Sequence, residues 1–228
     1  MPPPGVSGLG RQLAAGVSGQ RTMTVIIIFI TLAVSVVVLQ TDRDGLIARL
    51  GLRPYDVVQK RQWWRVVTHG FVHADYVHLA VNMITFFSFG RAIEQIFQSL
   101  EAAGAIGNHT TAFLLLYFGG MVAASVYDLM RYRRNPNYNS IGASGAVAAV
   151  IFASIFFAPW HSILFFGVLP IPGLLFGALY LYYEWYSART RRDGINHFAH
   201  IFGALYGLVF PLLLNPALWH NFVSGLKF

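Results

Sequence analysis

The sequence contains no cysteine among its 228 residues, and this absence excludes disulfide bonds, a thiolate nucleophile and a cysteine-ligated metal. Charged residues are also scarce: they make up 11% of the chain, whereas hydrophobic residues make up 56%. The few charges gather between long apolar runs instead of alternating with them. This composition, with a mean hydropathy of +0.55, indicates an integral membrane protein rather than a soluble domain.

Acidic residues are the rarer of the two charged types. Nine of them stand against sixteen Lys and Arg, which gives a net charge of +7. An excess of basic residues can indicate nucleic-acid binding, but here most of them lie in short connections between apolar runs. That distribution favours contacts with lipid headgroups. We therefore expect the lipid bilayer as a partner, and no nucleic acid.

Six apolar segments predict an all-α polytopic membrane protein with six transmembrane helices. The expected spans are 24–40, 77–96, 110–129, 141–157, 162–183 and 197–214. Their short connections predict one helical-bundle domain over residues 23–216, between a flexible N-terminal tail at 1–22 and a short C-terminal tail at 217–228. The basic residues before the first span are also typical of a signal peptide. Because no small-residue cleavage site follows it, we expect the span to be retained.

Two connections carry further signals. Residues 41–68 are polar and contain six basic residues beside Trp63 and Trp64, a combination that is typical of the headgroup level. We expect this first loop to lie along the membrane interface. The fifth span is interrupted by Pro170, Pro172 and Gly173, which predict a bent or loosely packed helix.

Ser144 stands at the start of the fourth span, between Gly142 and Gly145. Backbone N–H groups at a helix start have no partner within the helix, and the helix dipole favours negative charge there. A serine at this point therefore lies near donors that could stabilise an oxyanion. Taken alone, the stretch also fits a helix start whose small residues let neighbouring helices pack closely.

The sixth span carries His200, Gly203 and Gly207 on one helical stripe. Glycines at this spacing let two membrane helices approach until their backbones nearly touch. The fourth span offers a matching small-residue face that includes Gly145. Docking these faces would bring His200 near Ser144, which is the arrangement of an activated nucleophile.

The second span carries polar residues inside its first turns. His78 and Asn82 are four residues apart and share one helix face, and His73 lies just before them. Polar groups at membrane depth are costly without partners and often mark function. These two side chains either hold helices together by hydrogen bonds or help to stabilise an oxyanion.

No acidic residue is expected deep in the bundle. All nine are assigned to loops or to the ends of spans: Asp42, Asp44, Asp56, Asp75, Glu94, Glu101, Asp128, Glu184 and Asp193. A catalytic triad needs a carboxylate that orients its histidine. The sequence therefore favours a Ser144–His200 dyad over a triad.

Four histidines near the proposed site could in principle bind zinc: His73, His78, His197 and His200. However, the sequence lacks a His-Glu-x-x-His motif, and no carboxylate is expected within the membrane to act as general base. We therefore expect no metal and no other cofactor.

In this order, the motifs resemble the rhomboid family of intramembrane serine proteases, over residues 24–214. The resemblance rests on Trp64-Arg65, on His73 and His78-x-x-x-Asn82, on Gly142-Ala143-Ser144-Gly145, and on Ala199-His200-x-x-Gly203-x-x-x-Gly207. It implies a rhomboid-like bundle in which Ser144 is the nucleophile and His200 the general base. It also implies an oxyanion hole formed by His78, Asn82 and the backbone amide of Ser144.

The same resemblance implies roles outside the reacting atoms. Trp64 and Arg65 would belong to a first loop half-embedded in the outer leaflet, and Glu94 would have a structural role at the inner end of the second span. The bent fifth span would match the element that gates lateral entry of the substrate. The chain departs from some relatives at Ala148, where they carry an aromatic ring that packs on the catalytic imidazole. Either another aromatic residue, such as Phe152 or Phe202, supports His200, or the imidazole is held less firmly.

The function expected from the sequence is that of a serine endopeptidase. Its partners would be single-span membrane proteins, cleaved within or near their transmembrane segment, and its location a bacterial plasma membrane. Two alternatives are an inactive relative that binds membrane clients and a transporter that uses the histidines as a proton relay. The distribution of basic residues and the family resemblance favour opposite orientations in the membrane.

Overall fold

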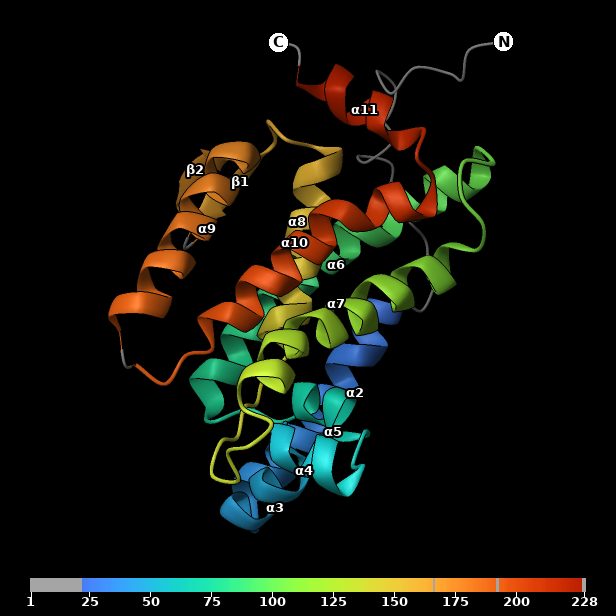
Figure 1. Cartoon of the computed structure of the whole chain (residues 1–228). Coiled ribbons are helices and arrows are strands. Elements are labelled where there is room, and N and C mark those ends of the chain that lie inside the picture. Colours follow the sequence, from blue (N-terminus) through green and yellow to red (C-terminus); the bar gives the residue numbers. More distant parts are fainter. Residues whose placement is uncertain (1–21, 166, 192, 227–228) are drawn as a thin grey trace.

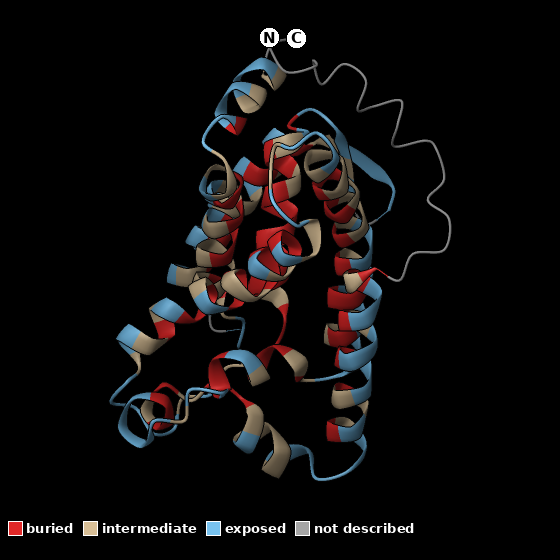
Figure 2. Cartoon of the chain, turned by 90° about the vertical axis from the view of Figure 1, so that its right-hand side faces the viewer, coloured by how far each residue is buried: buried red, intermediate tan, exposed pale blue. Residues whose placement is uncertain are grey.

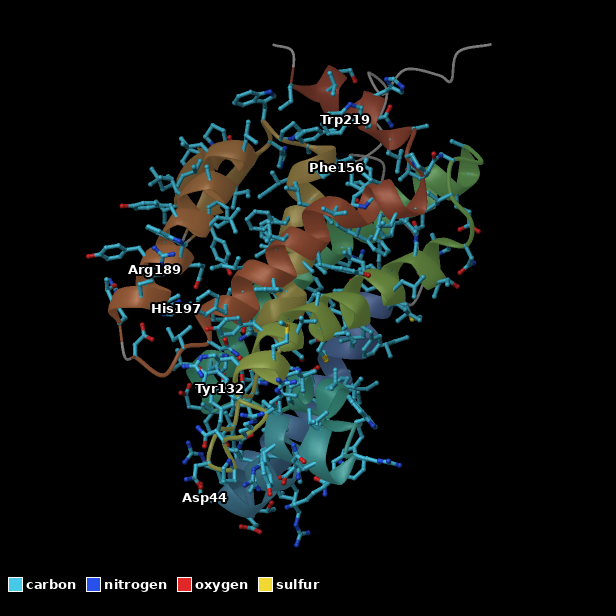
Figure 3. The ribbon with its side chains drawn as sticks, in the orientation of Figure 1. Asp44, Tyr132, Phe156, Arg189, His197 and Trp219 are labelled. Atoms are coloured by element: carbon cyan, nitrogen blue, oxygen red, sulfur yellow. The ribbon has the colours of Figure 1, made fainter. Side chains whose placement is uncertain are left out.

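The computed structural model describes residues 22–165, 167–191 and 193–226, which are mostly helical (Figure 1). The predicted tail at 1–22 therefore lies almost wholly outside the described residues. The elements are α2 (Met23–Gln40), α3 (Arg43–Leu50), α4 (Pro54–Lys60), α5 (Arg65–Thr68), the 3-10 helix η2 (His69–Phe71), α6 (Tyr76–Ala102), α7 (His109–Arg131), α8 (Ser144–Phe157), β1 (Ser162–Phe165), β2 (Leu169–Pro172), α9 (Gly173–Thr190), α10 (His197–Leu214) and α11 (Leu218–Gly225). Asp44 in α3 and Trp219 in α11 mark opposite ends of the molecule (Figure 3).

Among the described residues, three helices are long and apolar enough to cross a membrane: α2, α7 and α10. The apolar helix α8 is shorter than these three. In α6 and α9, charged side chains such as Glu94 and Glu184 interrupt the apolar sequence. The predominantly helical fold is as predicted. The count of six spans stays a prediction.

The outer faces of the long helices carry large apolar side chains. Phe29 on α2, Ile84 on α6 and Leu213 on α10 are each at least two-thirds exposed. Figure 2 shows buried residues among the helices and exposed residues mostly on the outside. Such outer faces would be unfavourable in water but match a hydrocarbon environment, so they fit an integral membrane protein.

Helix α8 forms the centre of the bundle and is buried over eleven of its fourteen residues. Helix α10 crosses it at very short range, because Gly203 lies against the backbone of Gly145 and Gly207 against the backbone of Ala149. A Cβ atom at either glycine of α10 would collide with the carbonyl oxygen of the residue opposite. The two small-residue faces therefore dock on each other as the spacing predicts.

The segment assigned to the fifth span does not begin as a helix. Residues 162–172 form an antiparallel hairpin, in which Ser162 pairs with Pro172 and Leu164 with Pro170. Proline lacks a backbone N–H and cannot continue a helix, but it is tolerated in edge strands. Both strands of a two-stranded ribbon are edge strands. The prediction of a bent helix from residue 162 is therefore wrong. Helix α9 begins at Gly173 and continues to Thr190.

Glu94 ties α6 to the start of α2. Its carboxylate accepts a hydrogen bond of 2.5 Å from the backbone N–H of Met23 and one of 2.7 Å from the hydroxyl of Thr24. The side chain is buried, and a negative charge at a helix N-terminus interacts favourably with the helix dipole. This geometry suits the structural role expected for Glu94.

The first loop is folded into short helices around Arg65. The buried guanidinium donates hydrogen bonds of 2.9 Å to the carbonyl oxygens of Ala48 and Gly51, and it lies 3.8 Å from the carboxylate of Asp56. The neighbouring Trp63 and Trp64 remain more than half exposed. The loop therefore keeps Arg65 inside and presents two large indole rings outward.

Gly203→Ala should destabilise the protein, because the added methyl group must push α10 away from α8. Overpacking of this kind costs about 1–3 kcal/mol. Thermal unfolding in detergent would measure the loss. Gly107→Ala is the matched control, since nothing lies within 4 Å of a Cβ atom at Gly107. Equal unfolding temperatures for the two variants would contradict the close contact.

Acidification should loosen the first loop. Burial alone would raise the pKa of Asp56, but a hydrogen bond from Lys60 and the charges of Arg53, Lys60 and Arg65 outweigh it, and the pKa is lowered. A lowered pKa in the folded state means that this stabilisation is complete above the ordinary Asp value of about 3.9 and is lost as the pH falls through the lower folded value. Hydrogen exchange over residues 43–68, corrected for intrinsic rates, should show loss of protection only below about pH 4. In Asp56→Asn this acid transition should be absent.

Candidate active site

Ser144 begins α8, and the chain that leads to it is held by backbone hydrogen bonds. Ser140 exchanges two backbone hydrogen bonds with Leu52, at 2.8 and 3.0 Å, and the N–H of Gly142 donates to the carbonyl of His69 at 3.0 Å. Gly142 has a φ of +115°, a conformation that favours glycine. The turn therefore presents the Ser144 hydroxyl at a fixed place on the first turn of the helix.

His200 lies in the first turns of α10 and contacts this hydroxyl directly. Its Nε2 atom is 2.7 Å from Ser144 Oγ. The sequence predicts this proximity, and the structure brings the two side chains together across the α8–α10 contact. A hydroxyl hydrogen-bonded to an imidazole nitrogen can lose its proton to that nitrogen when it attacks an electrophile.

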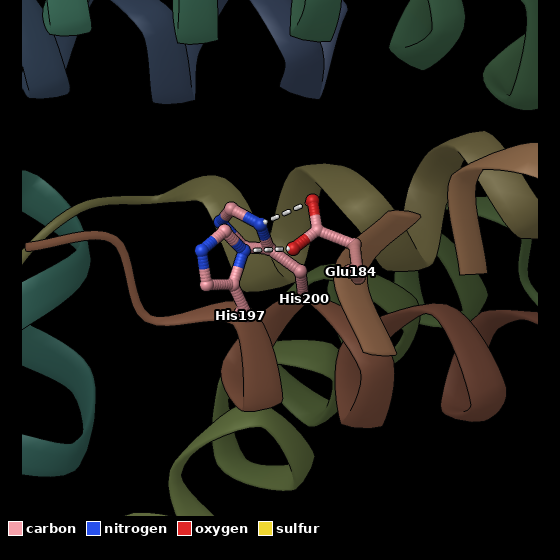
Figure 4. A group of neighbouring side chains, drawn as sticks. All are labelled: Glu184, His197 and His200. Carbon is pink, nitrogen blue, oxygen red and sulfur yellow. Dashed lines mark hydrogen bonds and ion pairs between the residues drawn. The ribbon is translucent and has the colours of Figure 1, made fainter. Parts of the chain in front are cut away.

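A carboxylate lies on the other side of the imidazole. Glu184 Oε1 is 2.9 Å from His200 Nδ1, and Glu184 Oε2 is 2.6 Å from His197 Nδ1 (Figure 4). Glu184 is 4% exposed and comes from α9, next to the start of α10, where Figure 3 labels His197. The expectation that no acid lies deep in the bundle is therefore wrong. It fails because α9 starts and ends later than predicted, which places Glu184 well inside the helix.

The start of α10 is fastened to the Ser144 loop by side chains that the sequence analysis did not single out. Asn196 caps α10 by accepting from the N–H of Ala199 at 3.1 Å. Its amide nitrogen donates to Asp128 at 2.6 Å and to Ser140 at 3.0 Å. These bonds join α7, the loop before Ser144 and α10, so they hold the two reacting side chains in register.

His78 borders the same space as Ser144. A Cβ atom at Gly142 would lie 3.0 Å from His78 Nε2 and 3.9 Å from Ser144 Oγ, so the missing side chain leaves room between these two groups. Asn82 is buried and donates through Nδ2 to the carbonyl of His78 at 2.9 Å. A carboxamide nitrogen carries two hydrogens, and this bond uses one of them.

His73 supports the loop from behind. Its ring is fully buried, with Nδ1 2.9 Å from the hydroxyl of Ser35 and Nε2 accepting from the N–H of Ala143 at 3.4 Å. Burial lowers the pKa of His73 to about 3. A neutral ring can donate to Ser35 from one nitrogen and accept from Ala143 with the other. His73 therefore positions the backbone next to Ser144.

The aromatic ring beside His200 comes from α9. Tyr180 lies with its ring centroid 6.4 Å from that of His200, at an interplanar angle of 31°. Of the two candidates from the sequence, Phe152 packs on Tyr180 at 5.6 Å, whereas Phe202 packs on Tyr127 at 6.1 Å. Tyr180 on α9 thus places beside His200 the aromatic ring that is missing at Ala148.

The same cluster also has the composition of a metal site. Within the described residues, the group that could hold a metal ion consists of Glu184, His197 and His200. Their potential ligand atoms lie within 4.8 Å of one another, and two imidazoles with one carboxylate are a common zinc ligand set. Here both oxygens of Glu184 are already engaged by the two rings, and the second nitrogen of His200 faces Ser144. The hydrogen bonds therefore account for the cluster. The absence of a metal stays a prediction.

The remaining residues singled out in the sequence have separate places. Gly145, Gly203 and Gly207 form the helix contact beneath the site. Trp64 and Arg65 belong to the first loop, where their neighbours are loop residues rather than His200.

The family model and the known proteins to which this chain is similar all belong to one family. Residues 60–217 match the family model described as "Rhomboid domain". RHOMBOID-like protein 12, mitochondrial, from Arabidopsis thaliana is 30% identical over 145 residues, which cover 61% of this chain and 43% of that protein. Rhomboid protein 1, mitochondrial, from Saccharomyces cerevisiae is 27% identical over 158 residues, or 67% of this chain and 42% of that protein. Rhomboid protease GluP from Bacillus subtilis is 28% identical over 118 residues, or 52% of this chain and 20% of that protein. The chain thus spans about half the length, or less, of these curated relatives.

Proposed function

The chain belongs to the rhomboid family, and from this premise we propose that it is a serine endopeptidase acting on membrane proteins. The observation that carries the proposal is the distance of 2.7 Å between Ser144 Oγ and His200 Nε2, inside a helical bundle with apolar outer faces. The substrates would be single-span membrane proteins, cleaved within or near their transmembrane segment. The Bacillus subtilis relatives are compatible with the bacterial plasma membrane as the proposed location.

The reaction follows from the hydrogen bond. Ser144 Oγ attacks the scissile carbonyl carbon while its proton passes to His200 Nε2. His200 then returns this proton to the leaving amine, the peptide C–N bond breaks, and an acyl-enzyme remains on Ser144. Water, deprotonated in turn by His200, releases the acid product and restores the hydroxyl.

The negative charge of the tetrahedral intermediate would be stabilised by three donors. The backbone N–H of Ser144 lies at the N-terminus of α8, where it is unpaired within the helix. His78 Nε2 borders the open space at Gly142, and Asn82 has one amide hydrogen left over from its bond to His78. Preorganised donors of this kind act strongly in a site shielded from water.

A transmembrane substrate would enter beside α9. This helix lies at the outer edge of the bundle (Figure 1), and only four of its eighteen residues are buried: Gly173, Gly177, Glu184 and Ser187. A helix attached by so few buried side chains can move at low energetic cost. Displacement of α9 would open a path from the lipid to Ser144.

Two other functions make different predictions. A relative that only binds membrane clients does not need a serine hydroxyl activated by an imidazole, so the short contact between Ser144 and His200 favours catalysis. A transporter would move ions or solute across liposomes. A protease reconstituted in the same liposomes should cleave a single-span substrate without such flux.

Ser144→Ala should abolish cleavage, with kcat falling by about 10³- to 10⁶-fold, because it removes the hydroxyl that His200 would activate. The measurement is cleavage of a single-span substrate in proteoliposomes, together with labelling by a fluorophosphonate probe. The wild-type protein should be labelled and Ser144→Ala should not. Cleavage by Ser144→Ala at the wild-type rate would refute the assignment.

Asn82→Ala should lower kcat by about 10- to 10³-fold, since it removes one donor to the oxyanion. KM should change little, because the donor acts on charge that develops only in the transition state. Asn215→Ala is a suitable control: its amide also donates to a backbone carbonyl, that of Ala105 at 2.8 Å, but at the other end of α10. If both variants kept the wild-type kcat, Asn82 would have only a structural role.

A further inference from the structure

We propose that Glu184 is a positioning residue for His200, so that the site works as a Ser144–His200–Glu184 triad and α9 carries part of the catalytic machinery. This inference rests on the proposed protease function. It assigns to Glu184 a task in the reaction itself, and to His197 the task of holding Glu184 in place.

The first support is the alignment of two hydrogen bonds on one ring. Glu184 Oε1 lies 2.9 Å from Nδ1 of His200, and Ser144 Oγ lies 2.7 Å from Nε2 of the same ring. A carboxylate can only accept, so the bond requires a hydrogen on Nδ1. In the neutral ring Nε2 then carries the lone pair, which is the nitrogen that must take the proton of Ser144. Glu184 thus selects the reactive tautomer.

The second support is the charge that develops during the reaction. When His200 accepts the proton of Ser144 it becomes an imidazolium, buried except for 15% of its side chain. A positive charge in such surroundings is costly unless an opposite charge lies close by. The carboxylate of Glu184, 2.9 Å from the ring and 5% exposed at its side chain, supplies this charge. It would stabilise the transition state more than the resting state.

The third support is the way in which Glu184 itself is held. A buried carboxylate is retained only where its oxygens have partners. His197, which is 4% exposed, binds Oε2 at 2.6 Å and leaves Oε1 directed at His200. Tyr180, one turn before Glu184 on α9, packs its ring beside that of His200. Two turns of α9 therefore hold the imidazole from one side.

The alternative is that Glu184 only provides hydrogen-bond acceptors for two buried imidazoles. A structural group would affect the amount and stability of folded protein. A positioning group would in addition affect the rate for each folded active site. The two roles are therefore separable by kinetics on protein whose active sites have been counted by titration.

The decisive variant is Glu184→Gln, which keeps the shape and one carbonyl acceptor but removes the charge. We expect kcat per titrated site to fall about 10²- to 10⁴-fold, with KM within about twofold of wild type, because the charge acts on the transition state. The rate of fluorophosphonate labelling should fall in parallel. Glu184→Asp, which keeps the charge on a shorter side chain, should recover part of the loss. In proton NMR, the far-downfield signal of the His200 Nδ1–H should disappear in Glu184→Gln.

Glu94→Gln is the matched control. Glu94 is equally buried, and its carboxylate also accepts two strong hydrogen bonds, but it lies on α6 and its partners are Met23 and Thr24 at the start of α2. This variant should lower the unfolding temperature and leave kcat per titrated site unchanged. Such a contrast would separate loss of a buried carboxylate in general from loss of this one.

Three results would overturn the inference. One is a wild-type kcat and labelling rate in Glu184→Gln while Ser144→Ala is inactive, a pattern that leaves the proposed protease function intact. Another is an equal loss of kcat in Glu94→Gln. The third is loss of wild-type activity on chelation with recovery by zinc, which would identify Glu184, His197 and His200 as metal ligands. Activity in Ser144→Ala would refute the protease proposal instead.

Discussion

The backbone contact between α8 and α10 is the constraint on which the site depends. Inside a bilayer no hydrophobic force drives one apolar helix against another, so close packing must supply the attraction. Gly203 meets the backbone of Gly145, and Gly207 meets that of Ala149, without side chains between them. This near-touching pair fixes the rotation and depth of both helices. As a result, a hydroxyl and an imidazole from residues 56 positions apart in the chain come within hydrogen-bond distance.

The features that could be predicted from the sequence are those with a local signal. The start of α8 follows from glycines around Ser144, and the stripe through His200 follows from helical spacing on α10. Each of these depends on neighbours within two turns. The pairing of the two small-residue faces then follows, because small residues on both helices allow their backbones to approach closely.

The features that could not be predicted depend on partners brought together by the fold. Whether Glu184 lies inside α9 depends on where that helix starts, and the hairpin formed around Pro170 sets this start. The ring that supports His200 comes from Tyr180 on another helix, so the small residue at 148 gave no indication of it. Asn196 joins two segments that lie 56 and 68 positions before it. None of these contacts has a signal in the local sequence.

The position of Glu184 on the outermost helix has a consequence for timing. The helix that would swing aside to admit a substrate would also be the one that orients the imidazole. While the gate stands open, His200 would lose both its carboxylate and the ring of Tyr180, and the serine would face an unaligned base. Reactivity would return only as α9 settles back against a seated peptide. Opening of the site and activation of the serine would thus exclude each other, so that water entering the open site would meet a serine that is not activated.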